Sequence, residues 1–212
     1  MKMKLKICGM KVPDNIAEVI QLRPDYLGFI FYPGSKRFIA DLDPSVIRGI
    51  PAEIKTTGVF VNETLEKVKQ AVADYGLKAV QLHGSEEPDY CGQLLGSVTV
   101  IKAFGMNADF DFSTLEPYVD AVDYFLFDTQ TPELGGSGKT FSWQLLEKYT
   151  LQKPYFLSGG IGLDSVAALK EIGDERLFAI DVNSRFEISA GLKDIDQLIE
   201  FKKLLGYPEA AD

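Results

Sequence analysis

The stretch Leu5-Lys6-Ile7-Cys8-Gly9 has the pattern of a short β-strand that ends on a thiol, with a glycine directly after it. Side chains of a strand alternate between two faces, so Leu5 and Ile7 share one face while Lys6 and Cys8 share the other. Two such positions lie roughly 6–7 Å apart. A cation at that distance favours the thiolate, which is the form that acts as a base or nucleophile. Cys8 is therefore a candidate reactive group, although a cysteine in this setting more often packs as a small hydrophobic residue.

The same pattern, a short apolar strand that ends on polar residues, recurs along the whole chain. Eight strands are predicted, at residues 5–8, 26–31, 56–61, 78–82, 98–103, 121–127, 154–157 and 177–180. Helical segments are predicted between and after them, at residues 12–22, 44–50, 62–76, 88–95, 110–118, 142–149, 164–172 and 195–205. We expect Asn62 to cap the third of these helices and Gly76 to end it.

Buried strands that alternate with helices pair in parallel, because each crossover returns the chain to the same end of the sheet. Eight units of this kind predict an α/β fold, a single (β/α)8 TIM barrel that spans residues 1–212 with a frayed tail at 206–212. An open α/β sheet with two strands miscounted is the alternative, since 212 residues is short for a barrel that usually needs about 250.

Composition narrows the class of protein. The net charge of −9 argues against a general nucleic-acid or anionic-membrane binder. Two cysteines and one histidine provide neither a disulfide framework nor zinc-ligand spacing, so we expect no metal. We predict no signal peptide and no stretch long enough to span a bilayer, and a cytoplasmic location is expected.

In a (β/α)8 barrel the carboxyl ends of the strands converge on one mouth, where such enzymes carry their active sites. The polar residues predicted at these ends are Cys8, Arg37, Asn62, Gln81, His83, Lys102, Asp128, Ser158, Asp181, Asn183 and Ser184. A purely structural barrel has no need to gather a thiol, an imidazole, carboxylates and cations at one end.

Glycines after the seventh strand predict a phosphate site. Gly159 and Gly160 can present bare backbone N–H groups to an anion, and Asn183 and Ser184 follow the neighbouring eighth strand. The glycine-rich stretch at 135–139 lacks the spacing of a Walker A loop, and we interpret the loop 130–139 as a mobile lid.

Short motifs in a fixed order run through nearly the whole chain. They are KICGM at 6–10, LGFIFYPGSKRF at 27–38, VFVN at 59–62, VQLHG at 80–84, FDT at 127–129, GGSGKTFSW at 135–143, LSGGI at 157–161, DVNSRFE at 181–187 and GLKD at 191–194. This set resembles the phosphoribosylanthranilate isomerase family of tryptophan biosynthesis, whose fold is a (β/α)8 barrel. The run 183–186 departs from the serine-serine-glycine type of that family.

The resemblance implies an aldose–ketose isomerase that carries out an Amadori rearrangement of N-(5-phosphoribosyl)anthranilate. It implies Asp128 as general acid and Cys8 as general base, with Arg37 holding the anthranilate carboxylate. The acid must hold a proton, which burial favours, whereas the pKa of Cys8 should be lowered, with Lys6 as the proposed helper.

The remaining site residues implied for this reaction bind substrate. Gln81, His83 and Asp181 are expected at the sugar or anilino group, and Gly159, Gly160, Asn183 and Ser184 at the phosphate. The reaction needs no cofactor, and the expected partner is a small phosphorylated substrate rather than nucleic acid or membrane. The chain is expected to be a monomer or a homodimer.

Two other functions stay open from the residues. One is a related phosphosugar isomerase or epimerase that shares the phosphate loops. The other is a phosphosugar-binding barrel without turnover, which would keep Arg37 and the glycine loops but tolerate loss of Cys8 or Asp128.

Overall fold

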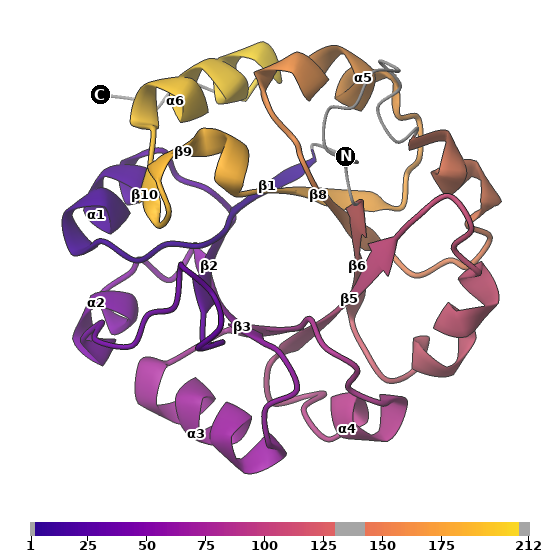
Figure 1. Ribbon diagram of the computed structural model, residues 1–212, viewed down its shortest axis with the longest axis horizontal. Helices are drawn as coiled ribbons and strands as arrows, with labels where there is room; N and C mark the ends of the chain where they lie inside the picture. The colour runs from indigo at the N-terminus through magenta and orange to yellow at the C-terminus, as the bar shows by residue number, and fades with distance from the viewer. Residues whose placement is uncertain (1–2, 130–142, 208–212) are drawn as a thin grey trace.

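The computed structural model describes residues 3–129 and 143–207 and forms a closed barrel of eight parallel strands (Figure 1). The strands are β1 (Lys4–Ile7), β2 (Tyr26–Ile30), β3 (Lys55–Phe60), β4 (Ala79–Leu82), β5 (Thr99–Met106), β6 (Tyr124–Thr129), β7 (Tyr155–Ser158) and β8 (Leu177–Val182). Each strand pairs with the next in sequence, and β8 closes the barrel by pairing with β1. The predicted (β/α)8 barrel is confirmed and the open sheet is wrong.

Helical segments surround the barrel, but several are shorter or tighter than predicted. The α-helices are α1 (Pro13–Gln21), α2 (Pro44–Arg48), α3 (Leu65–Tyr75), α4 (Pro88–Gly92), α5 (Val166–Glu171) and α6 (Ile195–Leu204). The 3₁₀ turns are η1 (Phe112–Tyr118), η2 (Trp143–Lys148), η3 (Leu163–Ser165) and η4 (Ser184–Phe186). In η1, Pro117 lies inside the segment, and a proline removes an N–H donor that a regular α-helix would need.

A two-stranded hairpin between β8 and α6 was not predicted. It consists of β9 (Glu187–Ser189) and β10 (Leu192–Lys193), which pair antiparallel. In Figure 1 it lies between α1 and α6. The hairpin thus brings two charged residues, Glu187 and Lys193, close to the start of the chain.

Of the two residues predicted to bound α3, the one at the start is wrong and the one at the end is confirmed. Thr64, not Asn62, caps the helix, and its hydroxyl accepts a hydrogen bond from Lys67 N. Asn62 lies before the helix with a φ of 51°, and its side chain accepts a hydrogen bond of 2.7 Å from Ser85 N. Asn62 therefore ties the loop after β3 to the loop after β4. Gly76 ends the helix in the left-handed conformation, as expected.

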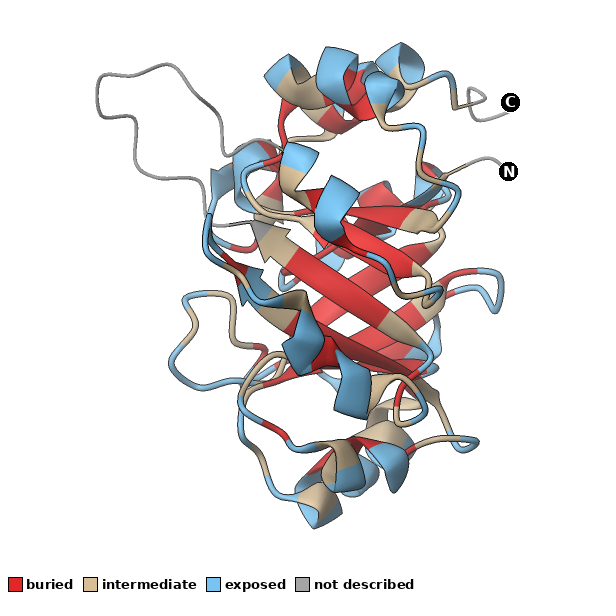
Figure 2. Ribbon diagram, turned by 90° about the vertical axis from the view of Figure 1, so that its right-hand side faces the viewer, coloured by how far each residue is buried: buried red, intermediate tan, exposed pale blue. Residues whose placement is uncertain are grey.

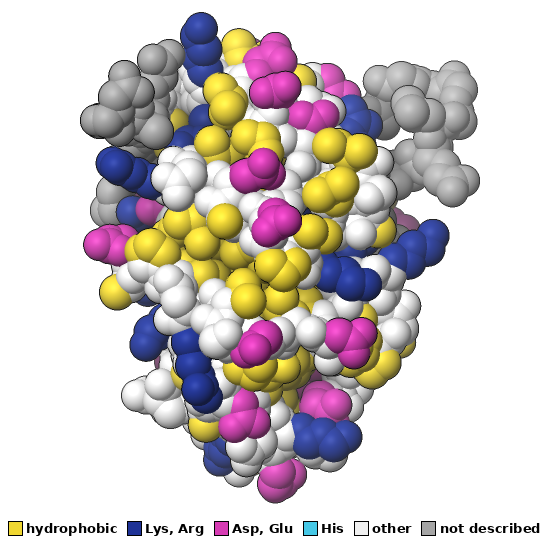
Figure 3. All heavy atoms as spheres, turned by 90° about the vertical axis from the view of Figure 1, so that its left-hand side faces the viewer, with side chains coloured by type: hydrophobic (Ala, Val, Ile, Leu, Met, Phe, Trp, Pro, Cys, Tyr) yellow, Lys and Arg dark blue, Asp and Glu magenta, His cyan; other side chains and the backbone are white. Residues whose placement is uncertain are grey.

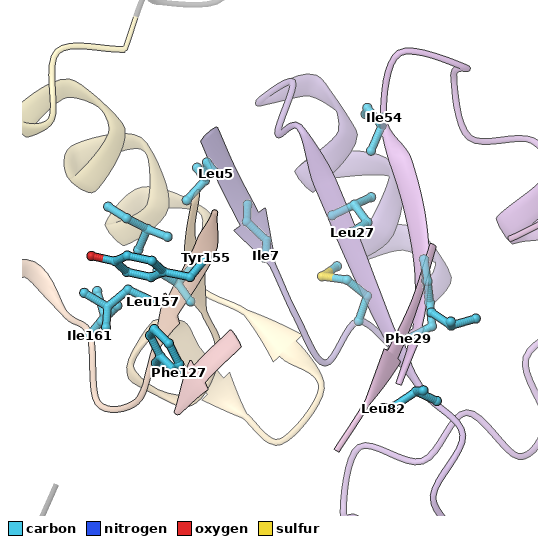
Figure 4. Packing of buried hydrophobic residues seen from close by; sticks show 14 of the residues in the cluster. Leu5, Ile7, Leu27, Phe29, Ile54, Leu82, Phe127, Tyr155, Leu157 and Ile161 are labelled. Carbon is cyan, nitrogen blue, oxygen red and sulfur yellow. The ribbon is translucent and has the colours of Figure 1, made fainter. Parts of the chain in front are cut away.

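The strands are buried on both faces (Figure 2). On the outer face, Leu5 and Ile7 of β1 join a large cluster with Leu27, Phe29 and residues of the surrounding helices (Figure 4). A second, smaller cluster belongs to the other face of the strands and contains Tyr26, Ala79, Ile101, Ala103, Leu126, Phe156 and Ala179. In a closed barrel this second face lines the interior. Residues two or four positions further along the same strands therefore face the mouth of the barrel.

The surface carries charges of both signs. The side of the molecule with α1 and α2 shows acidic and basic side chains interspersed with hydrophobic ones (Figure 3). Within residues 3–129 and 143–207, no helix is long and apolar enough to cross a membrane.

The last residue that the structure describes, Tyr207, is hydrogen-bonded to the rest of the protein. The Tyr207 hydroxyl donates a hydrogen bond of 2.7 Å to Met3 O, which joins the two termini. The described part of the tail expected to fray, Gly206 and Tyr207, is therefore docked, and residues 208–212 lie outside the described ranges. The predicted lid at 130–139 also lies outside them.

Candidate active site

The alternation along the strands brings six of the predicted side chains to the interior face. Lys6 lies in β1 and Cys8 directly follows it, Gln81 lies in β4 and His83 directly follows it, and Asp128 and Asp181 lie near the ends of β6 and β8. Gln81 and His83 lie two and four positions beyond Ala79, a residue of the interior cluster, and Asp128 and Asp181 lie two beyond Leu126 and Ala179. The alternation within Leu5–Cys8 is confirmed, and it explains why the thiol and these polar groups meet at one end.

Two glycines make room for the thiol and its neighbours. A Cβ on Gly28 of β2 would lie 2.6 Å from Cys8 Sγ. A Cβ on Gly9 would lie 2.6 Å from Arg37 Cδ and 2.6 Å from Asn183 Oδ1, and Gly9 has a φ of 76°. Both distances are far below van der Waals contact, so larger residues at these positions would displace Cys8 or Arg37.

Lys6 is the centre of a buried polar group. Its ammonium donates to Asp181 Oδ2 at 2.7 Å and to Gln81 Oε1 at 2.8 Å, and the Lys6 side chain has no solvent exposure. Burial lowers the pKa of Lys6, but Asp181 and Cys8 more than offset this effect, and its pKa is raised. Lys6 therefore carries a fixed positive charge beneath Cys8.

The direction predicted for the Cys8 pKa is wrong. Burial raises the pKa of the Cys8 thiol, and the carboxylate of Asp181 raises it further, while Lys6 and Lys193 lower it. Lys6 thus acts in the expected direction, but the cost of placing a thiolate at 4% exposure is larger. Depth of burial was the quantity that the sequence did not provide.

Asp181 interacts electrostatically with both Cys8 and Asp128. Burial raises the pKa of Asp181 against the attraction of Lys6, and the nearby Asp128 raises it further. The same Asp181 carboxylate acts on Cys8, so it lies within electrostatic reach of both predicted catalytic groups. Its Oδ1 is buried and has no hydrogen-bond partner among the described residues, which leaves an acceptor for a ligand.

Asp128 is less buried than a proton-holding acid was expected to be, with 34% of its side chain exposed. Its Oδ2 lies 3.3 Å from His83 Nε2, and His83 is exposed to a similar degree. His83 Nδ1 lies 3.0 Å from Gln81 Nε2. Gln81 is 2% exposed and bonded at both ends of its carboxamide, so it lies behind His83 and away from open space.

Arg37 is held by a residue that sequence reasoning missed. Its Nε donates to both carboxylate oxygens of Glu187, at 2.9 and 3.0 Å, and its Nη2 donates to Oε2 at 2.5 Å. The Lys193 ammonium donates to the same carboxylate at 2.7 Å and to Asn183 Oδ1 at 2.8 Å. The only sequence signal for Glu187 and Lys193 was their presence in the family-like segments 181–187 and 191–194.

The loops expected to bind phosphate are adjacent, because β7 pairs with β8. Gly159 and Gly160 both have positive φ, of 99° and 62°, backbone conformations that glycine adopts without steric cost. Ser184 follows β8 and is exposed. The side-chain oxygen of the preceding residue, Asn183, already accepts a hydrogen bond from Lys193. Asn183 therefore also bonds to the β9–β10 hairpin through Lys193.

Lys102 does not join the site. Its ammonium is buried and bonds to Glu86 Oε2 at 3.2 Å and to Gly84 O at 2.8 Å. It supports the loop after β4 instead.

At the mouth of this barrel, groups that can take up and release protons surround an unpartnered acceptor. This combination defines the class: a (β/α)8-barrel enzyme that works by acid–base catalysis. The family model for N-(5'-phosphoribosyl)anthranilate isomerase matches residues 5–203. The chain belongs to the phosphoribosylanthranilate isomerase family.

Individual relatives agree with this assignment. The isomerase of Parabacteroides distasonis is 42% identical over 210 residues, which cover 97% of this chain and 95% of the relative. The crystal structure of the Thermotoga maritima isomerase superposes with a TM-score of 0.81 at 36% identity, covering 96% and 98% of the two chains. A further isomerase structure, solved with reduced 1-(o-carboxyphenylamino)-1-deoxyribulose 5-phosphate, has a TM-score of 0.77 at 31% identity and covers 96% of each chain.

Proposed function

We propose that the chain converts N-(5-phosphoribosyl)anthranilate into 1-(2-carboxyphenylamino)-1-deoxyribulose 5-phosphate, with Asp128 as general acid and Cys8 as general base. The observation that carries this assignment is the position of Asp181, which interacts with both groups and keeps one carboxylate oxygen unpartnered. A proton donor and a proton acceptor that share a neighbour can act on the two atoms bonded to C1 of one bound sugar, the ring oxygen and C2.

The first step opens the furanose ring. The Asp128 carboxyl gives its proton to the ring oxygen, the bond from C1 to that oxygen breaks, and the anilino nitrogen lone pair forms an iminium. The exposure of Asp128 at the mouth supports contact with the substrate. Asp128 leaves this step as a carboxylate.

The second step moves the proton at C2. The Cys8 thiolate takes this proton, and the C–H electrons form a C1–C2 double bond as the iminium nitrogen becomes neutral. The resulting enolamine becomes the ketone when its hydroxyl loses a proton and C1 gains one, so no atom is gained or lost overall. The iminium is the electron sink. Lys6 favours the thiolate against the raised pKa of the buried thiol.

The proposed substrate contacts come from polar groups at the carboxyl ends of the strands. Arg37 binds the anthranilate carboxylate in an orientation set by Glu187. Asp181 Oδ1 accepts a hydrogen bond from the sugar or the anilino N–H. The backbone of Gly159 and Gly160, with Ser184, binds the phosphate. The partner is thus a small phosphorylated molecule, and we expect the reaction to take place in the cytoplasm.

The test is the loss of substrate fluorescence on addition of the protein, compared with Cys8→Ala and Asp128→Asn. General acid or base catalysis contributes roughly 10²–10⁴-fold, so each variant should lose about that much of kcat. Turnover equal to that of the unmodified chain in either variant refutes the role of that residue. Binding of substrate without turnover by the unmodified chain would indicate a binding protein.

A further inference from the structure

A line of polar contacts crosses the barrel interior and ends on Asp128. Lys6 Nζ on β1 donates to Gln81 Oε1 on β4 at 2.8 Å, and Gln81 Nε2 lies 3.0 Å from His83 Nδ1. His83 Nε2 then lies 3.3 Å from Asp128 Oδ2 at the end of β6. Lys6 and Gln81 are buried, whereas about a third of His83 and of Asp128 is exposed.

The first bond fixes the direction of all the others. An ammonium group only donates, so the carboxamide must turn its oxygen toward Lys6 and its nitrogen toward His83. The amide nitrogen also only donates, so His83 Nδ1 must accept. The ring proton of a neutral imidazole is then on Nε2, the nitrogen that lies 3.3 Å from Asp128 Oδ2. The tautomer of His83 is therefore assigned by a lysine on another strand.

We propose that Lys6 and Gln81 are positioning residues that hold His83 as the neutral Nε2–H tautomer, and that His83 thereby aims the carboxyl group of Asp128. The His83 N–H engages Oδ2, which leaves Oδ1 of Asp128 to carry the proton for the substrate. This inference rests on the proposed role of Asp128 as general acid.

The neutral state of His83 matters because an imidazolium would make a charge-assisted pair with Asp128. Such a pair is stronger than a neutral hydrogen bond and would hold Asp128 as a carboxylate, which has no proton to give. The charged groups around His83 include two acids: Asp128, whose Oδ2 lies 3.3 Å from Nε2, and Asp181, which interacts electrostatically with His83. The Gln81 amide donor on Nδ1 disfavours a proton there, because a protonated Nδ1 would face another donor.

The direct test is ¹⁵N nuclear magnetic resonance of the imidazole. The chain has one histidine, so its two ring-nitrogen signals need no assignment by mutation. At neutral pH we expect an unprotonated Nδ1 and a protonated Nε2. A signal pattern with the proton on Nδ1, or with both nitrogens protonated, overturns the proposal without any variant.

A second measurement uses Gln81→Glu, which keeps the size of the side chain but presents an acceptor to both Lys6 and His83. We expect both ring nitrogens to become protonated and kcat to fall about tenfold to a hundredfold, with KM unchanged. The matched control is Gln152→Glu, in the loop before β7, where the glutamine is exposed. The control should keep kcat and the neutral ring.

Two results separate this proposal from the proposed function. If Gln81→Glu doubly protonates His83 and kcat does not fall, the inference fails while the isomerase activity stands. If the unmodified chain lacks turnover, or Asp128→Asn retains it, the proposed function fails whatever the state of His83. If Gln81→Glu does not fold, the spectrum of the unmodified chain still decides the tautomer.

Discussion

Lys6 and Asp181 lie opposite each other in the register of β1 and β8, and their side chains form an ion pair of 2.7 Å that is almost completely buried. This pair joins the first and last strands of the barrel directly beneath Cys8. Ion pairs at such depth are poor sources of stability, because desolvation offsets most of their attraction. The role of this pair is better explained by the charge that it places next to the thiol.

Replacing Lys6 by Met should change the pH dependence of the reaction. Lys6 lowers the pKa of Cys8 against the effect of burial, so its removal raises that pKa further. Activity that needs the thiolate increases with pH, and its ascending limb should therefore move to higher pH, with a lower rate at neutral pH. The measurement is kcat/KM against pH. Lys4→Met is the control on the same strand, because Lys4 pairs with Asp25 at the surface. An unmoved limb in Lys6→Met would leave Lys6 a structural role only.

A single methyl group at Gly28 should displace the thiol. The Cβ would lie 2.6 Å from Cys8 Sγ, which is buried on all sides and has little room to move. We expect Gly28→Ala to reduce kcat by about 10²-fold, the loss that a displacement of about 1 Å can cause. Gly92→Ala is the control, since a Cβ there meets no atom within 4 Å. A Gly28→Ala variant with normal kcat would mean that the Cys8 sulfur tolerates displacement and is not the base.

Glu187 should determine how well Arg37 binds the substrate carboxylate. Glu187→Gln keeps one of the two oxygen acceptors but replaces the second oxygen with an amide N–H₂ donor that faces the guanidinium. We expect KM to rise about tenfold with kcat little changed, because an interaction made equally in ground and transition states is lost. Glu66→Gln on the exposed side of α3 is the control. A fall in KM would contradict the prediction and identify Glu187 as a competitor of the substrate for Arg37.

Strand count and alternation could be predicted because each strand carries its own local signal. The alternation of Leu5, Lys6, Ile7 and Cys8 gave the correct faces, and eight apolar runs gave the closed barrel. The end of α3 was also local, since Gly76 supplies the left-handed residue that ends the helix. The start of α3 could not be predicted from local sequence, because the Asn62 side chain accepts a hydrogen bond from Ser85 in the loop after β4.

The part of the site that could not be predicted depends on burial and on pairs distant in sequence. The sign of the Cys8 pKa shift is set by the cost of desolvation, which no spacing reveals. Arg37 and Glu187 are separated by 150 residues and meet only because β1 closes against β8. The hairpin that carries Glu187 is too short, at three and two residues per strand, to show an alternating pattern.

Glu187 should also make stability depend on pH in a defined direction. Although burial raises the pKa of Glu187, its hydrogen bonds with Arg37 and Lys193 outweigh this effect, and its pKa is lowered in the folded chain. A lowered pKa contributes stability above the unfolded value, and this contribution is lost as the pH falls through the folded value. Glu187→Gln should therefore lower the free energy of unfolding by about 2 kcal/mol near neutral pH, the scale of a hydrogen bond to a charged group. Urea unfolding of both chains should show this difference shrink below the ordinary glutamate pKa of about 4.3. A difference that stays constant across that range would mean that Glu187 is not ionised beside Arg37, and the orientation proposed for the guanidinium would lose its basis.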